Sequence, residues 1–383
     1  MSEGDPDEIR VRIGQGVGAF DADQWDACAG ADNPFLSHAF LTILEESGSV
    51  GGGTGWQALP IAVEGPGGGI AGVVPSYAKS HSQGEYVFDH GWADAWTRAG
   101  GRYYPKLQIA VPFTPVPGPR LLLADPAAAP ALIAAVESVV DANDLSSAHA
   151  TFITPDQIPL FEGAGWLIRE GVQFHWQNQG FDDFGGFLDT LASRKRKAIR
   201  KERAAAVAGL EVVHLSGAAI TEAHWDAFWH FYQDTGARKW GRPYLTRRFF
   251  SLLGQRMADR VLLILALRDG QPIAGALNLI GEDTLYGRYW GAVEEVPFLH
   301  FELCYYQAID AAIERGLARV EAGAQGEHKL ARGYAPVPTW SAHYIPNASF
   351  RDAVARFLEA ERAEMEREIE ELGAFTPFRK GDG

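Results

Sequence analysis

Two short stretches in the second half of the sequence contain the residue types that proton transfer requires. His300 and Glu302 stand where an aromatic, strand-like segment gives way to a helix-like one, and Glu327 and His328 follow a glycine-flanked turn. A carboxylate or an imidazole can accept a proton from a reacting group, so these four residues are the candidate catalytic residues. The alternatives are that Glu302 complements a helix dipole and that His300 caps a helix or packs.

A second set of residues suits the binding of an anionic or polar ligand. Arg288 stands between Tyr286 and Trp290 at alternate positions, so the three should share one face of a strand. They could line a groove, or Arg288 could face solvent between packed aromatic rings. The other candidate binding residues are Lys329, Arg332, Lys239, Trp240, Tyr244, Arg200 and Lys201. The segment 239–244 reads either as a lid over the ligand or as a structural turn.

The run SRKRKAIRKER, residues 193–203, places seven basic side chains in a chain of formal net charge −15. On a helical projection most of these side chains lie opposite an apolar wedge that contains Leu188, Leu191 and Ile199. The pattern predicts an amphipathic helix docked on a domain, rather than a targeting signal or a free nucleic-acid arm. Its cations could meet phosphates of a ligand, pair with the acidic tail, or remain solvated.

Several other residues could have either a chemical role or a structural one. His175 and His343 recur in both halves at equivalent places, which favours a structural position for each. Asp89 and His90 could form an acid–base pair or a binding feature. Cys304 is more typical of a buried helix cysteine than of a nucleophile, and no GxSxG elbow supports serine chemistry.

The second half has a clear order of elements that would position the candidate residues. Asp269-Gly270 is a hairpin signal and Gly316 is typical of a helix end. The predicted strands are 261–270, 271–281, 284–292, 317–324 and 339–345, and the predicted helices are 184–208, 222–257, 299–316 and 328–334.

The first half repeats this order more loosely. Gly-aromatic, eight residues, His-aromatic occurs at 165–176 and again at 333–344, with a constant offset of 168 residues. The predicted strands are 56–65, 67–78, 86–93 and 146–153, and the predicted helices are 130–144 and 155–166. We therefore expect an α/β (α+β, mixed-sheet) fold with domains at 1–180 and 181–350, the latter the active half. Residues 351–383 would form an acidic helix and tail.

This order of helices, hairpin strands and a helix between adjacent strands resembles the GNAT acyltransferase fold. Two copies in tandem resemble the FemAB-like family, over roughly residues 30–350, and a bacterial branch of predicted N-acyltransferases in particular. The matching stretches are PFLSHAFLTILEESG, FGGFLDTLASRKRKAIRKERAAAV, GALNLIGEDTLYGRYWGA and HFELCYYQAIDAAIERGLARVEAGAQGEHKLARGY.

The resemblance implies transfer of an acyl or aminoacyl group to a primary amine of a small-molecule, peptide or cell-wall-precursor acceptor. His300 and Glu302 would then flank the acyl-donor site. The base would be Glu302 or Glu327, the latter acting directly or through His328 or water. GNAT enzymes that use acetyl-CoA have a glycine loop for the pyrophosphate, and the corresponding residues 297–302 contain no glycine. This weakens acetyl-CoA as the donor and leaves an aminoacyl-tRNA, an acyl carrier or another activated acyl group open. No tightly bound cofactor is expected, with acyl-CoA or aminoacyl-tRNA as the possible co-substrate.

Charge, cysteine content and the lengths of the apolar runs exclude several kinds of partner and of protein. The acidic charge disfavours DNA as a partner, whereas tRNA as a donor carrier stays open. The two cysteines and the histidines show no metal-ligand spacing. The polar N-terminus and the short apolar runs predict a cytoplasmic protein without a membrane span. The alternative to an enzyme is a binding protein of the same fold that recognises a peptide or peptidoglycan-type ligand.

Overall fold

The chain forms two compact units that do not coincide with the two halves of the sequence. The computed structural model describes residues 10–239, 243–323, 326–374 and 377–378; for residues 236–239, 327 and 374 it describes the backbone alone. One unit is Met1–Gly171 with Pro338–Glu366, and the other is Val172–Val337 with Arg367–Gly383. This division differs from the predicted boundary near residue 180 and from a separate tail, because the closing strand of each half starts in one unit and ends in the other.

The first unit contains two sheets. Its strands are β1 (Arg10–Ile13), β2 (Trp56–Ala58), β3 (Ile61–Glu64), β4 (Ile70–Val74), β5 (Ser76–Lys79), β6 (Lys106–Ile109), β7 (Leu122–Leu123), β8 (Ala148–Ile153), the start of β9 (Leu167–Gln177) and the end of β15 (Ala335–Tyr344). Its helices are α1 (Ala22–Ala29), α2 (His38–Glu46), α3 (His90–Arg98), α4 (Ala129–Ala142), α5 (Ile158–Gly163) and most of α12 (Ala348–Ala374). One sheet has the order β1-β3-β4-β7, and in the other β15, β8, β6, β5 and β2 are successive neighbours.

The second unit contains a sheet with α-helices on both faces. Its strands are the end of β9, β10 (Glu211–Leu215), β11 (Val261–Arg268), β12 (Gln271–Ile280), β13 (Thr284–Ala292), β14 (Arg319–Glu321) and the start of β15. Its helices are α6 (Phe184–Thr190), α7 (Ser193–Ala206), α8 (Glu222–Lys239), α9 (Arg247–Arg256), α10 (Leu299–Phe301), a π-helical turn (Glu302–Tyr306), α11 (Gln307–Glu314) and a 3-10 helix (Glu327–Arg332).

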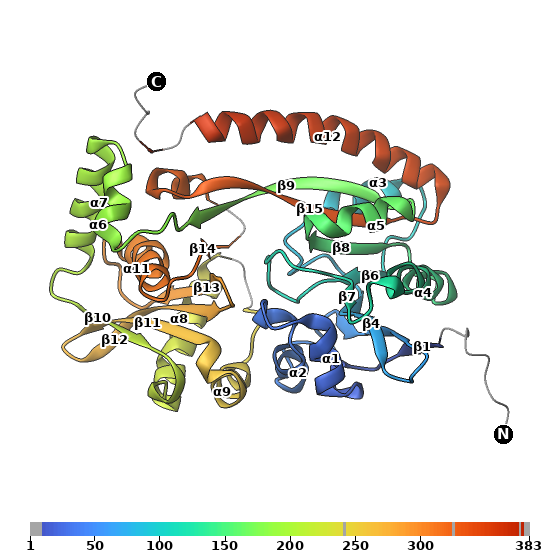
Figure 1. Ribbon diagram of the computed structural model, residues 1–383, viewed down its shortest axis with the longest axis horizontal. Coiled ribbons are helices and arrows are strands. Elements are labelled where there is room, and N and C mark those ends of the chain that lie inside the picture. The colour runs from blue at the N-terminus through green and yellow to red at the C-terminus, as the bar shows by residue number, and fades with distance from the viewer. Residues whose placement is uncertain (1–9, 240–242, 324–325, 375–376, 379–383) are drawn as a thin grey trace. The chain divides into compact units, whose positions relative to one another are not determined.

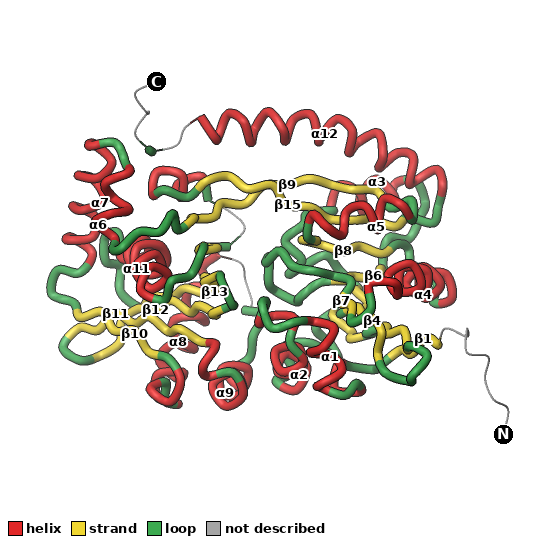
Figure 2. The backbone as a smooth tube through the Cα atoms, in the orientation of Figure 1, coloured by secondary structure: helices red, strands yellow, loops and turns green. Residues whose placement is uncertain are grey.

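Successive side chains of the central strands of the second unit point to opposite faces of the sheet, and helices pack on both faces. Strands β10 to β13 are antiparallel neighbours, and they lie side by side in Figure 2. Leu262 and Ile264 of β11 pack in the same buried cluster as the residues of α11. A Cβ at Gly275 would contact both Leu265 and Phe228, which places α8 on the opposite face. Figure 1 shows α11 on one side of these strands and α9 on the other.

The predicted elements of the second half are confirmed, with one strand missed. In the first half one predicted element is wrong, and β1, β6, β7 and α1 were not predicted. The missed strand is β10, whose short segment EVVHL pairs with β11 along the sheet edge. Residues 86–93, predicted as a strand, instead lead into helix α3, which begins at His90. Trp92 and Trp96 stand one turn apart on that helix, a spacing of four that also satisfies a helical pattern.

The internal repeat marks equivalent backbone positions in the two halves. Gly165 and Gly333 each follow a short helix with positive φ, 80° and 88°, a conformation that favours glycine. His175 and His343 are both buried in their closing strands. His343 Nδ1 lies 2.7 Å from Nδ1 of His149 inside the first unit, so its place there is structural.

Candidate functional site

Two strands of the second unit separate partway along their length and leave an opening in the sheet. Strands β13 and β14 are parallel and pair over three residues, ending at Tyr286 opposite Glu321. Beyond that point β13 continues to Ala292. A β-bulge between β12 and β13 makes Arg288 an extra residue in this stretch, because Asn278 pairs with Gly287. Such bulges redirect side chains next to active sites.

A cavity of about 100 Å³ lies at this opening. Its walls come from the bulged parts of β12 and β13, the first turns of the helix after β13, and the residue after β14. The lining residues are Ala276, Leu277, Asn278, Gly287, Arg288, Tyr289, Trp290, His300, Cys304, Tyr305 and Ala322. Three residues predicted from the sequence, Arg288, Trp290 and His300, thus lie together here.

A second cavity of about 220 Å³ adjoins the first. Trp290 and His300 line both cavities, so the imidazole stands at their junction. The ring centres of these two residues are 5.3 Å apart in an edge-to-face arrangement. Glu294 and Glu295 also line the second cavity, which makes that side of the site acidic. Glu294 receives a hydrogen bond from Arg268 Nε at 3.0 Å.

The helix that brings Cys304 and Tyr305 to the cavity is a π-helical turn, and Glu302 anchors it. Glu302 is 1% exposed and accepts hydrogen bonds from Arg203 with both carboxylate oxygens, at 2.9 to 3.2 Å. Gln307 donates a further bond of 2.7 Å to Oε1. A carboxylate held in this way stabilises helix geometry, and short π-helical turns are common at functional sites. These contacts engage both carboxylate oxygens of Glu302, an arrangement that favours positioning of the π-helical turn over proton transfer.

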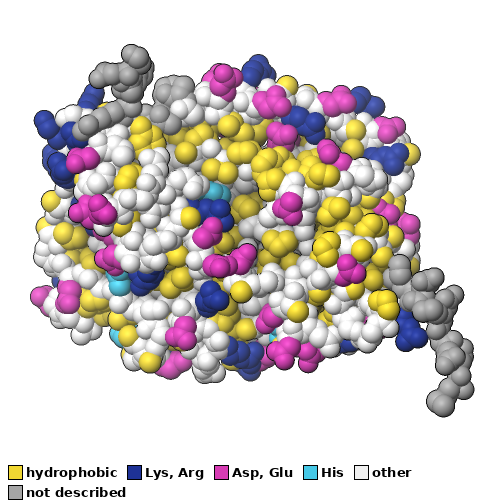
Figure 3. Space-filling view, viewed as in Figure 1, with side chains coloured by type: hydrophobic (Ala, Val, Ile, Leu, Met, Phe, Trp, Pro, Cys, Tyr) yellow, Lys and Arg dark blue, Asp and Glu magenta, His cyan; other side chains and the backbone are white. Residues whose placement is uncertain are grey.

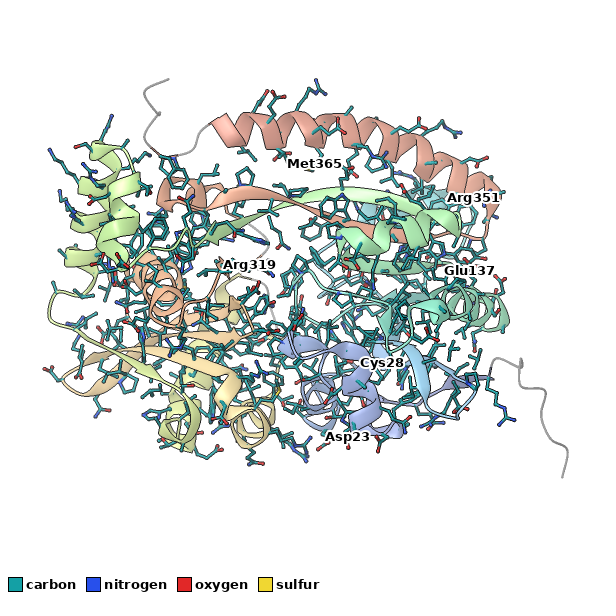
Figure 4. All side chains as sticks on the ribbon, viewed as in Figure 1. Asp23, Cys28, Glu137, Arg319, Arg351 and Met365 are labelled. Carbon is teal, nitrogen blue, oxygen red and sulfur yellow. The ribbon has the colours of Figure 1, made fainter. Side chains whose placement is uncertain are left out.

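Two buried ionisable groups flank the cavity. Lys329, 1% exposed, donates a hydrogen bond of 2.8 Å to the Gly323 carbonyl, and burial lowers its pKa to about 7. Glu321 ends β14, and burial raises the pKa of its carboxyl group to about 8. The nearest cation to Glu321 is Arg319, whose Nε lies 3.6 Å from Oε1; Arg319 is labelled in Figure 4.

The next predicted residues lie beside the cavity and support its wall. His328 is exposed, and its Nε2 lies 2.8 Å from the hydroxyl of Tyr305. Arg332 stacks over the ring of Phe301 at 3.5 Å and donates to Glu202 Oε2 at 3.0 Å. These contacts connect the segment after β14 to α7 and to the helix after β13.

The remaining predicted residues are not part of the cavity wall. Tyr286 is buried between its neighbouring strands, and Tyr244 is half-buried, with a pKa raised by burial. Arg200 and Lys201 are exposed on α7, where Figure 3 shows basic side chains gathered. Trp240 lies outside the described residues, and so do the side chains of Lys239 and Glu327.

Sequence reasoning missed most of the residues that line the cavity and one charged residue beside it. Asn278, Gly287 and Tyr305 line the cavity, and Glu321 lies beside it. The polar Asn278 within an otherwise apolar strand was the one available signal, since a buried strand interior rarely holds an amide. The bulge that places Gly287 opposite Asn278 left no mark in the sequence.

The first unit contains a buried cluster of ionisable side chains around Lys106. Lys106 is fully buried and bonds to Asp89 and, at 2.7 Å, to Glu85. Tyr103 donates a hydrogen bond of 2.6 Å to Asp89. His90 is exposed, so the sequence neighbours Asp89 and His90 occupy different environments.

No described helix is both long enough and apolar enough to cross a bilayer. Among the described residues, no three His, Cys, Asp or Glu side chains gather closely enough to hold a metal ion.

Comparisons with known proteins agree with the fold. Solved structures that are similar to this chain include FemX, with 13% identity over 88% of this chain and 98% of that one, TM-score 0.54. The structure of L-PGS from Bacillus licheniformis has 11% identity over 83% and 95%, TM-score 0.50. The C-terminal domain of a putative lysylphosphatidylglycerol synthetase from Agrobacterium fabrum has 10% identity over 89% and 96%, TM-score 0.51. No curated protein is significantly similar in sequence.

These likenesses confirm the expected architecture of two GNAT-like domains with a mixed sheet. The model of the FemAB-like family, described as peptidoglycan biosynthesis/recognition, matches residues 16–380, nearly the whole chain. The chain therefore belongs to the FemAB-like family, and at that level it is a protein of peptidoglycan biosynthesis or recognition built on an acyltransferase fold.

Proposed function

We propose that the second unit transfers an activated acyl or aminoacyl group to a primary amine. The observation that carries this proposal is the opening between β13 and β14, where an imidazole, a guanidinium and a buried amide line one cavity. Apolar and aromatic walls with few polar groups are typical of sites that bind small reacting groups.

The acceptor amine would enter from the second cavity. A free amine carries a positive charge at neutral pH, and Glu295 would attract it, whereas Glu294 is already paired with Arg268. The family description favours an amine on a peptide or cell-wall precursor as the acceptor.

The reaction needs one proton acceptor and one group that stabilises negative charge. His300, at the junction of the cavities, would take the proton from the ammonium and so free its lone pair. The nitrogen then attacks the acyl carbonyl carbon, a C–N bond forms, and the bond from that carbon to the carrier oxygen or sulfur breaks. The second proton lost by the nitrogen passes to the departing oxygen or sulfur. Arg288 would stabilise the charge that develops on the carbonyl oxygen or on the leaving group.

The donor would be an activated acyl carrier, either aminoacyl-tRNA or acyl-CoA. Helix α10 starts after Phe298, which itself has positive φ of 65°, and the segment before it has no glycine to admit a pyrophosphate. The exposed cations of α7, including Arg200 and Lys201, would suit a polyanionic carrier such as tRNA. Titration of the protein with tRNA and with CoA at several salt concentrations separates the two, because tRNA binding weakens steeply with salt.

The test of the transfer is a variant of the imidazole. His300→Gln should lower kcat for acyl transfer by about 100-fold or more, the usual contribution of a general base. The donors would be an aminoacyl-tRNA pool and acetyl-CoA, and the acceptors would be peptides with a free lysine amine. His230→Gln is the control, since His230 is an exposed histidine on α8. Equal rates for both variants would exclude His300 as the base, and binding without turnover in the unmodified protein would favour a recognition protein instead.

A further inference from the structure

The two cavities of the site have walls of opposite charge. Arg288 lines the first cavity and not the second, whereas Glu294 and Glu295 line the second and not the first. Glu294 is paired with Arg268, so the exposed Glu295 gives this wall its negative charge. None of the described residues that line the second cavity is a lysine or an arginine. A cationic group is therefore favoured in the second cavity and disfavoured in the first.

Trp290 is the aromatic wall that the two cavities share. The residue is partly exposed and lines both, and its ring packs against the buried cluster of the second unit. A Cβ at the next residue, Gly291, would overlap the Phe231 carbonyl oxygen of α8, so the Trp290 side chain points to the opposite face of the sheet. There the ring stands edge-to-face with His300, with 5.3 Å between the ring centres. These contacts hold the indole in place beside the imidazole.

An accessible indole beside a carboxylate is suited to an organic ammonium group. The face of an aromatic ring attracts cations, and tryptophan does so more strongly than tyrosine or phenylalanine. This attraction increases when the cation has lost part of its water, as it does inside a cavity. A carboxylate on the same ligand would meet the opposite conditions, because it would approach Glu295 and find no described lysine or arginine in the wall. The second cavity should therefore distinguish a simple ammonium from a zwitterion.

We infer that the second cavity binds an alkylammonium group on a carbon that bears no carboxylate, and that the Trp290 ring contacts the cation. This inference rests on the proposed function, because it specifies the acceptor amine. Ala292, Val296 and Leu299 line the same cavity and would contact the alkyl chain. The cavity of about 220 Å³ has room for several methylene groups. The acceptor is thus an amine at the end of an alkyl chain rather than the α-amine of an amino acid.

The experiment measures the binding of three probes by ligand-observed NMR. The probes are pentylamine, 1-pentanol, which lacks the charge, and norleucine, which adds a carboxylate beside the amine. The unmodified protein should bind pentylamine about tenfold more tightly than either of the others. Trp290→Leu should lower the affinity for pentylamine about tenfold and change that for 1-pentanol by less than about twofold, whereas Trp290→Phe should retain most of the binding. The matched control is Trp229→Leu, since Trp229 is a partly exposed tryptophan of α8 that lines neither cavity.

A second variant keeps the test decisive if Trp290→Leu does not fold. Glu295→Gln changes an exposed side chain and should lower the preference for pentylamine over norleucine about threefold. An unchanged preference in that variant overturns the inference, and so do equal losses of pentylamine and 1-pentanol in a folded Trp290→Leu protein.

The outcomes also separate this inference from the proposed function. Equal binding of pentylamine and norleucine by the unmodified protein, or acyl transfer to both at equal rates, overturns the inference and leaves the transfer reaction in place. Selective binding of pentylamine without turnover from either donor keeps the inference and overturns the transfer reaction instead.

Discussion

Removal of the Glu302 carboxylate should destabilise the second unit without removing its chemistry. Glu302→Leu deletes the ion pair with Arg203 and the bond from Gln307, and it leaves the Arg203 guanidinium beside an apolar side chain. Loss of one partner of a buried ion pair costs about 3–5 kcal/mol. Arg203 keeps Asp310 at 2.6 Å and is 22% exposed, so we expect about 3 kcal/mol, the lower end.

Urea denaturation followed by tryptophan fluorescence measures this effect. For a unit of this size about 3 kcal/mol lowers the midpoint by about 1–1.5 M urea. The matched control is Glu211→Gln, since Glu211 is an exposed glutamate at the start of β10 and should leave the midpoint unchanged.

A double variant distinguishes positioning from proton transfer. Arg203→Met combined with Glu302→Leu replaces this ion pair by apolar side chains. It also removes Arg203 from Asp310, whose side chain is 23% exposed and can be hydrated, so the double variant should recover part of the lost stability. If Glu302 only holds the π-helical turn, the stabilised double variant transfers the acyl group with an unchanged pH–rate profile. A Glu302→Leu protein as stable as the control would refute the ion-pair argument. A stable double variant that has lost turnover would indicate that Glu302 is the general base.

Three further predictions follow from burial and contact. Burial lowers the pKa of Lys329 to about 7 in the folded protein, whereas the pKa of a lysine in the unfolded chain is about 10.4. Between these two pH values the unfolded state binds more protons, so the free energy of unfolding rises with pH. Lys329→Met should remove this rise in urea midpoints between pH 7 and 9, and an unchanged slope would contradict it. Gly291→Ala places a Cβ 2.3 Å from the Phe231 carbonyl oxygen and should cost about 2 kcal/mol or more in thermal denaturation, whereas a neutral effect would show that α8 can move. Arg200→Glu with Lys201→Glu should raise KM for the donor and leave the melting temperature unchanged. Unaltered kinetics would show that the basic side chains of α7 contact solvent only.

The order of elements was predictable from the sequence because it depends on local patterns. Alternating apolar residues, the Asp269-Gly270 turn and the Gly316 helix end each act within a few residues. The same holds for the repeat at Gly165 and Gly333, whose backbones share a positive φ. The error at residues 86–93 arose because Tyr86, Phe88 and Trp92 stand at alternate positions, as in an aromatic strand, whereas Trp92 pairs with Trp96 one turn along helix α3.

The site itself was predictable only in part. His300, Arg288 and Trp290 could be chosen by residue type, and the structure brings them to one cavity. Glu302 had the same residue type, but the sequence could not show that Arg203, 99 residues away, occupies both of its oxygens. Asn278 was missed because its access to the cavity depends on a bulge, a property of strand pairing rather than of sequence.

Strands β9 and β15 each begin in one unit and end in the other, so the chain cannot be divided near residue 180 into two complete fragments. A fragment that ends near residue 180 lacks the segment of β15 that pairs with β8 and encloses His149. The complementary fragment lacks the end of β9, which pairs with β14 through Trp176 opposite Val320. Each fragment would expose an unpaired strand edge and would tend to aggregate when produced alone. Produced together, the two fragments should complement each other, because each supplies the strand segment that the other lacks.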